Sequence, residues 1–207
     1  ICNPNNPTGT IVDSDEMKSF LDRVPDHVIV VMDEAYGEFI DEEGYQMGID
    51  FGKQGYPVLT IRTFSKLYGL AGLRVGYVVG TEELLKPILA VREPFAVNRI
   101  AHDAAVAALE DTTYKEKILA EVKKEKVFLM EAFEKLALEV TPSYTNFLFV
   151  NLKRDATEVF DALMQKGILI RPCAAWGLPE YARITIGTRE QNEFVIEEME
   201  QLLEGVQ

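Results

Sequence analysis

A single lysine, Lys66, lies at the end of an apolar segment in the stretch TFSKLYGLAGLRVGY, residues 63–77. Desolvation would lower the pKa of its amine and make it a nucleophile able to bond covalently to an aldehyde. Ser65 and Arg74 lie on either side of it with a hydroxyl and a guanidinium, which are donors suited to a phosphate. A lysine that merely extends its amine into solvent is the alternative. The nearby Ser65 and Arg74 favour the interpretation of Lys66 as a nucleophile.

An acidic residue and a tyrosine follow another apolar run. In DEAYGEF, residues 33–39, Asp33 comes directly after VIVVM, and Tyr36 follows a short step later. A carboxylate at the end of a buried strand is costly unless it is paired. We expect Asp33 to face a cationic ring nitrogen, although a cap on the next segment or an ion pair with an arginine would also satisfy it. We expect Glu34 to be a structural partner rather than an acid catalyst.

Three further stretches supply an amide and two guanidinium groups. NPNNPTG, residues 3–9, encodes a tight turn, in which Asn6 either serves the turn alone or points its amide at a ligand. Arg183, in YARITIGT, precedes an apolar strand, and Arg171, in ILIRPC, is a second candidate. Each arginine could hold a carboxylate or phosphate through two parallel hydrogen bonds, or could form a structural ion pair.

Together these residues predict a site for pyridoxal 5'-phosphate, a cofactor that carries an aldehyde, a phosphate and a pyridine ring. Lys66 would form a Schiff base with the aldehyde and, once displaced by substrate, would move a proton between two carbon atoms. Asp33 would keep the pyridine nitrogen protonated, so that the ring accepts electrons from a carbanion. The phenolic oxygen and the phosphate would be held by Tyr36, Asn6, Ser65 and Arg74.

The elements that must position these residues alternate along the chain as apolar strands and amphipathic helices, which is typical of an α/β fold. The predicted strands are residues 28–32, 58–64, 75–80, 145–152, 168–171 and 182–187. The predicted helices are residues 13–24, 81–92, 98–110, 113–138, 155–166 and 188–204. We expect Asp13, with Glu16 in a capping box, and Thr81 to cap the first two of these helices, and Thr188 and Gln191 to form a capping box at the start of the last. The chemical motifs fall at the ends of strands, where open α/β sheets place their ligand sites.

The pattern divides the chain into two regions. Residues 1–110 predict part of a mostly parallel sheet flanked by helices. Residues 111–207 begin with the long helix and predict a smaller α+β domain. The first residues, ICNPNN, look like the end of a strand, so we expect the chain to begin inside a domain.

Composition excludes several classes of protein. The 207 residues carry a net charge of −13, and binding to nucleic acid needs a basic surface instead. The longest apolar runs have the length of strands, and no signal peptide is recognisable, so we expect neither a membrane span nor secretion. Cys2 and Cys173 cannot build a disulfide framework, and neither has the spacing of a metal ligand. We therefore expect a cytoplasmic protein without a metal site.

The order of the motifs NPNNPTG, DEAY, T-x-SK, GLAGLRVGY and RITIGT closely resembles the fold-type-I aminotransferases over essentially the whole chain. Within that family, RITIGTREQN most resembles the histidinol-phosphate aminotransferases. The resemblance implies that residues 1–110 are the C-terminal part of the cofactor-binding large domain and that residues 111–207 are the small domain. It assigns Arg183 to the carboxylate or phosphate of the substrate. It assigns the cofactor to Asn6, Asp33, Tyr36, Ser65, Lys66 and Arg74.

The implied reaction is transamination between histidinol phosphate and 2-oxoglutarate in histidine biosynthesis, carried out by a homodimer. One alternative is an aromatic amino-acid aminotransferase of the same fold, because such pockets overlap. Another is a non-catalytic binding module, which a basic DNA-binding segment would support, and the sequence has none. The family's N-terminal portion normally supplies a phosphate loop and a ring-stacking aromatic residue. We therefore expect this chain alone to hold the cofactor weakly.

Overall fold

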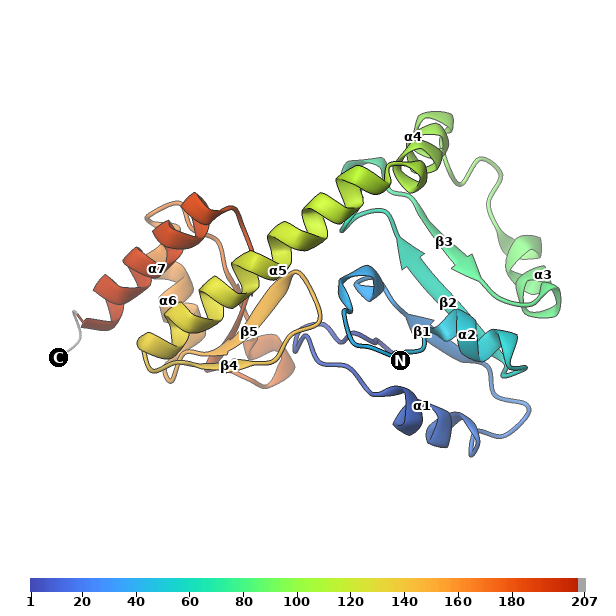
Figure 1. The fold of residues 1–207 in the computed structure, drawn as a ribbon, viewed down its shortest axis with the longest axis horizontal. Helices are drawn as coiled ribbons and strands as arrows, with labels where there is room; N and C mark the ends of the chain where they lie inside the picture. The colour runs from blue at the N-terminus through green and yellow to red at the C-terminus, as the bar shows by residue number, and fades with distance from the viewer. Residues whose placement is uncertain (205–207) are drawn as a thin grey trace. The chain divides into compact units, whose positions relative to one another are not determined.

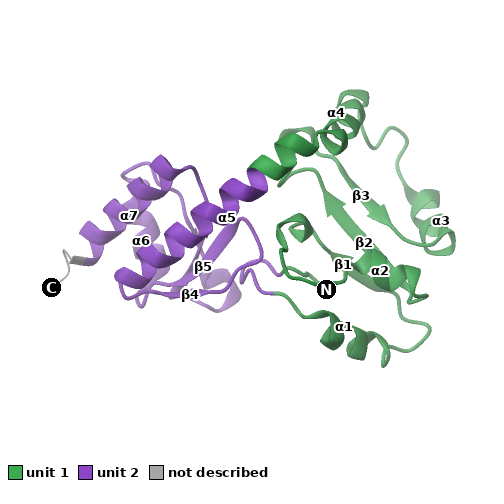
Figure 2. Ribbon diagram, in the orientation of Figure 1, with its two compact units in different colours: residues 1–4, 11–117 green, residues 5–10, 118–207 purple. Residues whose placement is uncertain are grey.

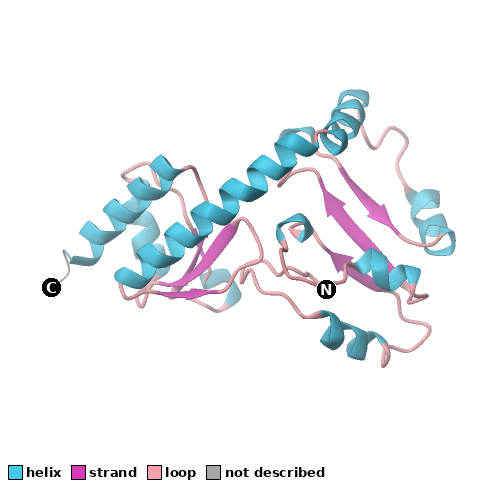
Figure 3. Cartoon of the chain, in the orientation of Figure 1, coloured by secondary structure: helices cyan, strands magenta, loops and turns pink. Residues whose placement is uncertain are grey.

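The structure, a computed structural model, describes residues 1–204 (Figure 1). The chain forms two compact units, which Figure 2 distinguishes by colour. Unit 1 comprises residues 1–4 and 11–117, and unit 2 comprises residues 5–10 and 118–207. The predicted α/β fold class is confirmed by the helices and sheets of Figure 3.

Unit 1 is built on a sheet of three strands in the order β1-β2-β3. These strands are β1 (Val30–Asp33), β2 (Val58–Thr63) and β3 (Gly76–Val79). β1 and β2 run parallel with Asp33 opposite Ile61, and β3 runs antiparallel to β2. All three lie within or beside the ranges predicted from the sequence. The parallel pair places the carboxyl ends of β1 and β2 at one edge of the sheet.

Two helices cover one face of this sheet. The predicted α1 (Ser14–Leu21) begins as expected at Asp13, whose Oδ1 accepts a hydrogen bond from the Glu16 amide, but it ends three residues early. α2 (Gly48–Lys53) was not predicted, because its glycines disfavour a helix. The core between these helices and the strands consists of Met17, Leu21, Val30, Met32, Phe51 and Val58.

The opposite face of the sheet is partly open to solvent. Val31 and Ile61 are exposed there, and they line a groove of about 670 Å³ together with Leu89. Leu89 belongs to α3 (Glu82–Val91), which Thr81 caps as predicted. A further helix, α4 (Arg99–Glu110), starts at the N-cap Asn98, also as predicted.

The long helix α5 (Thr112–Lys135) contributes its residues to both units in turn. Its predicted end at residue 138 is wrong. Ala137 has a φ of 56°, and the Leu138 amide bonds back to the Phe133 carbonyl, so the helix closes at Lys135. An unpredicted strand follows directly.

Unit 2 contains an antiparallel sheet in the order β4-β5-β7-β6. Its strands are β4 (Glu139–Thr141), β5 (Phe147–Asn151), β6 (Arg171–Pro172) and β7 (Tyr181–Thr185). The predicted helices appear as α6 (Ala156–Met164) and α7 (Arg189–Glu204). Predicted strand 168–171 is shorter and later than expected.

The capping box predicted for α7 is confirmed. The Thr188 amide donates to Gln191 Oε1, and the Gln191 amide donates to Thr188 Oγ1. The core of unit 2 packs α5, α6 and α7 on the sheet through residues that include Leu129, Phe133, Leu148, Leu163, Ile184 and Met199. Within residues 1–204, no helix is both long and apolar enough to cross a membrane.

Candidate functional site

In unit 1, the predicted site residues follow the carboxyl ends of the two parallel strands. Asp33 is the last residue of β1, and Lys66 comes three residues after the end of β2. Tyr36 comes three residues after the end of β1, and it is buried. The Lys66 Nζ atom lies 5.1 Å from the centroid of that ring, within the range of a cation–π contact. The structure therefore brings Lys66 and Tyr36 together.

The expected desolvation of Lys66 is wrong. Lys66 is exposed, whereas Phe64, Leu67 and Tyr68 around it are buried. The Phe64 ring packs against the Tyr68 ring at a centroid distance of 5.1 Å, and it also packs against Tyr77. The apolar neighbours thus anchor the loop and leave the amine accessible. Its role as a covalent nucleophile remains a prediction.

Asp33 is also exposed at the end of its strand. Its Oδ1 atom accepts a hydrogen bond of 3.1 Å from the Ala35 amide. The Asp33 amide donates to the Ile1 carbonyl, and the Asn3 amide donates to the Asp33 carbonyl, so the first residues of the chain run beside β1. The carboxylate caps the turn, which was one of the alternatives considered, and it remains accessible to a ligand.

The predicted phosphate residues make local contacts. The Ser65 amide donates to Thr63 Oγ1 at 3.0 Å. Arg74 has a φ of 53°, and its Nη1 atom donates to the Ala71 carbonyl of the short helix η2 (Ala71–Leu73). A non-glycine residue in this left-handed region costs on the order of 1 kcal/mol, and such residues are often found at ligand sites. Among residues 1–204, no hydrogen bond joins Ser65 to Arg74.

Asn6 belongs to unit 2, whereas the other predicted cofactor residues belong to unit 1. Its Oδ1 atom accepts a hydrogen bond of 2.7 Å from Arg183 Nη1. The Arg183 guanidinium lies 5.1 Å from the centroid of the Phe147 ring, and its Nε atom is buried without a hydrogen-bond partner among residues 1–204. A buried donor without a partner is costly, so this atom is left short of one hydrogen bond.

Arg171 and Arg183 lie directly opposite each other on β6 and β7, so their side chains leave the same face of the sheet. Arg171 is exposed, and its guanidinium lies 5.5 Å from the centroid of the Trp176 ring. Within the described part of the chain, neither arginine forms an ion pair. Like charges in this position repel each other. No acidic side chain among residues 1–204 offsets this repulsion, and the role of the two arginines in binding an anion stays a prediction.

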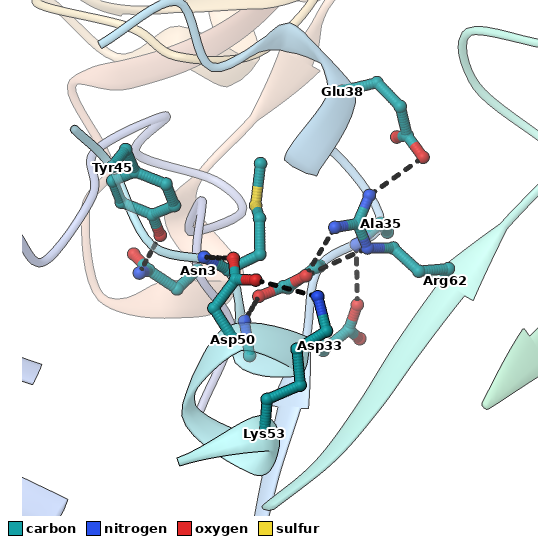
Figure 4. A network of polar contacts seen from close by, with 11 residues as sticks. Asn3, Asp33, Ala35, Glu38, Tyr45, Asp50, Lys53 and Arg62 are labelled. Atoms are coloured by element: carbon teal, nitrogen blue, oxygen red, sulfur yellow. Dashed lines mark hydrogen bonds and ion pairs between the residues drawn. The ribbon is translucent and has the colours of Figure 1, made fainter. Parts of the chain in front are cut away.

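A buried polar network lies next to the unit 1 residues, in which Glu34 is a structural partner as predicted, but sequence reasoning missed the arginine at its centre. Its centre is Arg62, on β2, which bonds to Glu34 and Glu38 (Figure 4). Arg62 Nη2 and Nε lie 2.8 and 2.9 Å from Glu34 Oε2, and Nη1 lies 3.1 Å from Glu38 Oε1. The available signal was an arginine inside the apolar run VLTIRTF.

Burial opposes both charges of this network. Desolvation raises the pKa of Glu34, against the lowering effects of the Gly48 amide and of Arg62. Desolvation acts to lower the pKa of Arg62, but the carboxylates of Glu34 and Glu38 outweigh it and the pKa is raised. The guanidinium therefore stays charged. Removing one partner of such a buried pair costs about 3–5 kcal/mol, because the other charge is left uncompensated.

The arrangement offers two kinds of chemistry, one in each unit. Unit 1 presents an accessible amine, a tyrosine ring and an accessible carboxylate at the ends of adjacent parallel strands, which suits covalent capture of an aldehyde beside a basic ring nitrogen. Unit 2 presents two guanidinium groups on one face of an antiparallel sheet, which suits a carboxylate or phosphate.

Comparison with known proteins gives a consistent result. A family model described as "Aminotransferase class I and II" matches residues 1–199. A histidinol-phosphate aminotransferase of Moorella thermoacetica is 45% identical over 204 residues, which are 98% of this chain and 53% of that protein. The chain thus spans about half the length of the curated relatives it matches.

Two solved structures are similar as well. The histidinol-phosphate aminotransferase of Sinorhizobium meliloti, in complex with pyridoxal-5'-phosphate, is 27% identical with a TM-score of 0.89, covering 100% of this chain and 57% of that one. The L-threonine-O-3-phosphate decarboxylase of Porphyromonas gingivalis is 32% identical with a TM-score of 0.87, covering 99% of this chain and 63% of that one.

Proposed function

Because the chain belongs to the aminotransferase class I and II family, we propose that it provides the reactive lysine of a pyridoxal-phosphate-dependent aminotransferase. The proposed substrates are histidinol phosphate and 2-oxoglutarate, and the proposed role is in histidine biosynthesis. The relative that is 45% identical and carries this name supports the choice of substrate. We further propose that the whole protein is a cytoplasmic homodimer.

The observation that carries the proposal is the position of Lys66 Nζ, 5.1 Å from the Tyr36 ring, where the parallel strands β1 and β2 end. The donor set fits the cofactor: an amine for its aldehyde, a carboxylate for its ring nitrogen, and a hydroxyl and a guanidinium for its phosphate. When bound, the cofactor supplies an electron sink for the negative charge that develops on the substrate.

The unit 1 residues have distinct proposed tasks. Lys66 would hold the cofactor and, once released from it, would move a proton as a general acid and base. Asp33 would accept a hydrogen bond from the ring nitrogen and stabilise its positive charge. Tyr36 would bond to the phenolic oxygen, and Ser65 and Arg74 would orient the phosphate. We propose that the Asn6 side-chain amide bonds to the phenolic oxygen, as its Nδ2 atom is not used in the bond to Arg183.

In unit 2, we propose that Arg183 and Arg171 bind the anionic group of the substrate. The unpartnered Nε atom of Arg183 and the lack of any acid bonded to either arginine within residues 1–204 support this task. Two of the names among the similar proteins, histidinol-phosphate aminotransferase and L-threonine-O-3-phosphate decarboxylase, refer to phosphorylated compounds. An aromatic amino acid, the alternative from sequence, would offer its carboxylate instead.

A substrate panel on the full-length protein tests the proposal. Purified protein loaded with pyridoxal phosphate is given 2-oxoglutarate and one of four compounds: histidinol phosphate, phenylalanine, tyrosine or threonine-O-3-phosphate. We expect glutamate to form fastest with histidinol phosphate. Faster turnover of phenylalanine or tyrosine would show that an aromatic amino acid is the substrate. Release of carbon dioxide from threonine-O-3-phosphate would show that the reaction is a decarboxylation. No turnover of any of the four compounds would contradict the proposed enzymatic activity.

A further inference from the structure

We propose that Arg62 is a positioning residue for Lys66, acting through its ion pairs with Glu34 and Glu38. The inference rests on the proposed function, because it assigns a task in cofactor chemistry to a residue that itself lies outside the donor set. The segments that Arg62 joins carry Asp33 and Tyr36 on one side and Lys66 on the other.

The geometry places Arg62 between these segments. Arg62 precedes Lys66 by four residues, and the backbone beside it is already paired to the other strand, since the Glu34 amide donates to the Ile61 carbonyl at 2.9 Å. The guanidinium then bonds to Glu34 and Glu38, which lie on either side of Tyr36 in the chain. One side chain thus ties the end of β2 to the two glutamates that flank Tyr36 in the chain, and Figure 4 shows its bond to Glu38.

The carboxylate of Glu34 is held at both of its oxygens. Oε2 accepts from Arg62, and Oε1 accepts from the Gly48 amide at the start of α2. Glu34 is fully buried, with 0% of its side chain exposed. Because neither oxygen can turn without breaking a buried hydrogen bond, the rotamer of Glu34 is fixed, and the guanidinium has one position available.

Two glycines leave the room that this arrangement needs. A Cβ atom at Gly37 would lie 3.1 Å from the guanidinium carbon of Arg62. A Cβ atom at Gly48 would lie 3.1 Å from Glu34 Oε1 and 2.5 Å from Thr60 Oγ1. The backbone around the ion pair is therefore fitted to the charged groups and not to an apolar filling.

The energetics favour a positional role. Buried ion pairs are in general no more stabilising than well-packed apolar side chains of the same volume, since desolvation offsets the attraction. What an arginine adds is direction, because the N–H groups of its planar guanidinium donate to carboxylates only along fixed directions. Lys66 is exposed and makes one cation–π contact, with Tyr36, so the place of its amine depends on the backbone segments that Arg62 holds.

The test is Arg62→Lys in the full-length protein, with Arg189→Lys as the matched control. Arg189 bonds to the buried Glu125 in unit 2, so the control also replaces the fork of an arginine that pairs with a buried glutamate, although Arg189 itself reaches solvent. We expect Arg62→Lys to lower kcat by about 100-fold, the usual penalty for displacing a reacting group by about 1 Å, and to change KM little. Arg189→Lys should leave kcat unchanged.

A second readout does not need the loaded enzyme. Acetylation of lysines in the cofactor-free protein, followed by peptide mass spectrometry, gives the rate at Lys66 relative to Lys117 on α5. Arg62→Lys should change this ratio, and Arg189→Lys should not. If the wild type neither binds the cofactor nor transaminates while the ratio still responds to Arg62→Lys, the proposed function fails and the positioning role survives.

A milder variant keeps the proposal testable if Arg62→Lys does not fold. Glu38→Gln retains the pair with Glu34 and weakens one bond, and it should lower kcat several-fold in the same direction. The proposal is overturned if Arg62→Lys, or Glu38→Gln in its place, lowers thermal stability alone and leaves both kcat and the Lys66 ratio at the wild-type values.

Discussion

The two units each bury a glutamate against an arginine, but the pairs differ in their surroundings. In unit 1, the side chains of Arg62 and Glu34 are 13% and 0% exposed and join the ends of two strands. In unit 2, those of Arg189 and Glu125 are 42% and 8% exposed and join α7 to α5. The same chemical pair is thus closed off from water in one unit and half open in the other.

Their electrostatics differ in sign. Burial raises the pKa of Glu34 despite the opposing effects of Gly48 and Arg62. Burial also acts to raise the pKa of Glu125, but hydrogen bonds from Arg189 and Asn192 outweigh it, and the pKa is lowered. The solvent-accessible pair of Arg189 and Glu125 therefore stabilises its unit as an ordinary ion pair. The enclosed pair is costly to charge, and we infer that it is kept for geometry.

The largest expected effect is on stability, from truncation of the two glutamates. Glu34→Ala leaves the Arg62 guanidinium buried with Glu38 alone, and it should lower the free energy of unfolding by about 3–5 kcal/mol. Glu125→Ala leaves Arg189 able to reach water, and it should cost about 1 kcal/mol or less. Urea denaturation of both variants measures the difference. Equal losses would show that the two pairs do not differ in the cost of losing their glutamate.

The second largest expected effect is on substrate binding, from substitutions in unit 2. Arg183→Ala removes the buried donor of unit 2 and should lower kcat/KM for histidinol phosphate by about 10–100-fold, mostly through KM, because a hydrogen bond to a charged group is lost. Arg171→Ala should have a smaller effect, since Arg171 is exposed. Steady-state kinetics with varied substrate test this, and a fall in kcat at unchanged KM would assign Arg183 to the chemical step instead.

The third expected effect is on stability, from adding a methyl group at Gly37 beside Arg62 or at Gly52 away from it. Gly37→Ala puts a methyl group 3.1 Å from a guanidinium that two carboxylates hold in place, so it should lower the free energy of unfolding by about 1–3 kcal/mol. Gly52→Ala on α2 meets only the Val58 carbonyl, at 3.9 Å, and should raise it by about 0.5–1 kcal/mol. Thermal denaturation compares them, and shifts of the same sign would show that Gly37 leaves no special room for Arg62.

The smallest effect is on pH dependence. A carboxyl whose pKa is lowered on folding adds stability above its unfolded pKa, and loses it as the pH falls through the lower folded value. Glu125 therefore stabilises the fold above pH 4.5, its ordinary pKa, and less below it. Glu125→Gln should lower stability at about pH 7 by up to about 1 kcal/mol, and the difference should shrink in acid.

Glu34 should behave in the opposite way, because its pKa is raised on folding. Protonation of this group favours the folded state as the pH falls through the raised value. Urea denaturation at several pH values measures both trends. If the stability difference between the wild type and Glu125→Gln grew in acid, the lowered pKa assigned to Glu125 would be contradicted.

Much of the fold could be predicted from the sequence, because local signals decide it. The caps at Asp13, Thr81 and Asn98 and the box at Thr188 are encoded within a few residues of where they act. α2 could not be predicted, since its glycines argue against a helix and its place depends on packing of Phe51 in the core. A contact with the core overrode the local propensity.

The site divides in the same way. The motifs predicted Lys66, Asp33 and Tyr36 as site residues, because each lies at or just after the end of a strand, and their role stays a prediction. The pairing of Arg171 with Arg183 depends on the register of β6 and β7, and the bond from Arg183 to Asn6 spans 177 positions, so neither could be predicted from spacing. Lys66 was expected to be desolvated because its neighbours are apolar, but those neighbours turn inward and leave it exposed.

The central claim is that Lys66 is the residue that binds the cofactor covalently. The direct measurement is to load the full-length protein with pyridoxal phosphate, reduce it with sodium borohydride, and locate the added mass by peptide mass spectrometry. The account predicts that the modification falls on Lys66, and that Lys66→Ala loses both the modification and more than about 1,000-fold of the transaminase activity. Modification of another lysine in a fully active Lys66→Ala variant would contradict it.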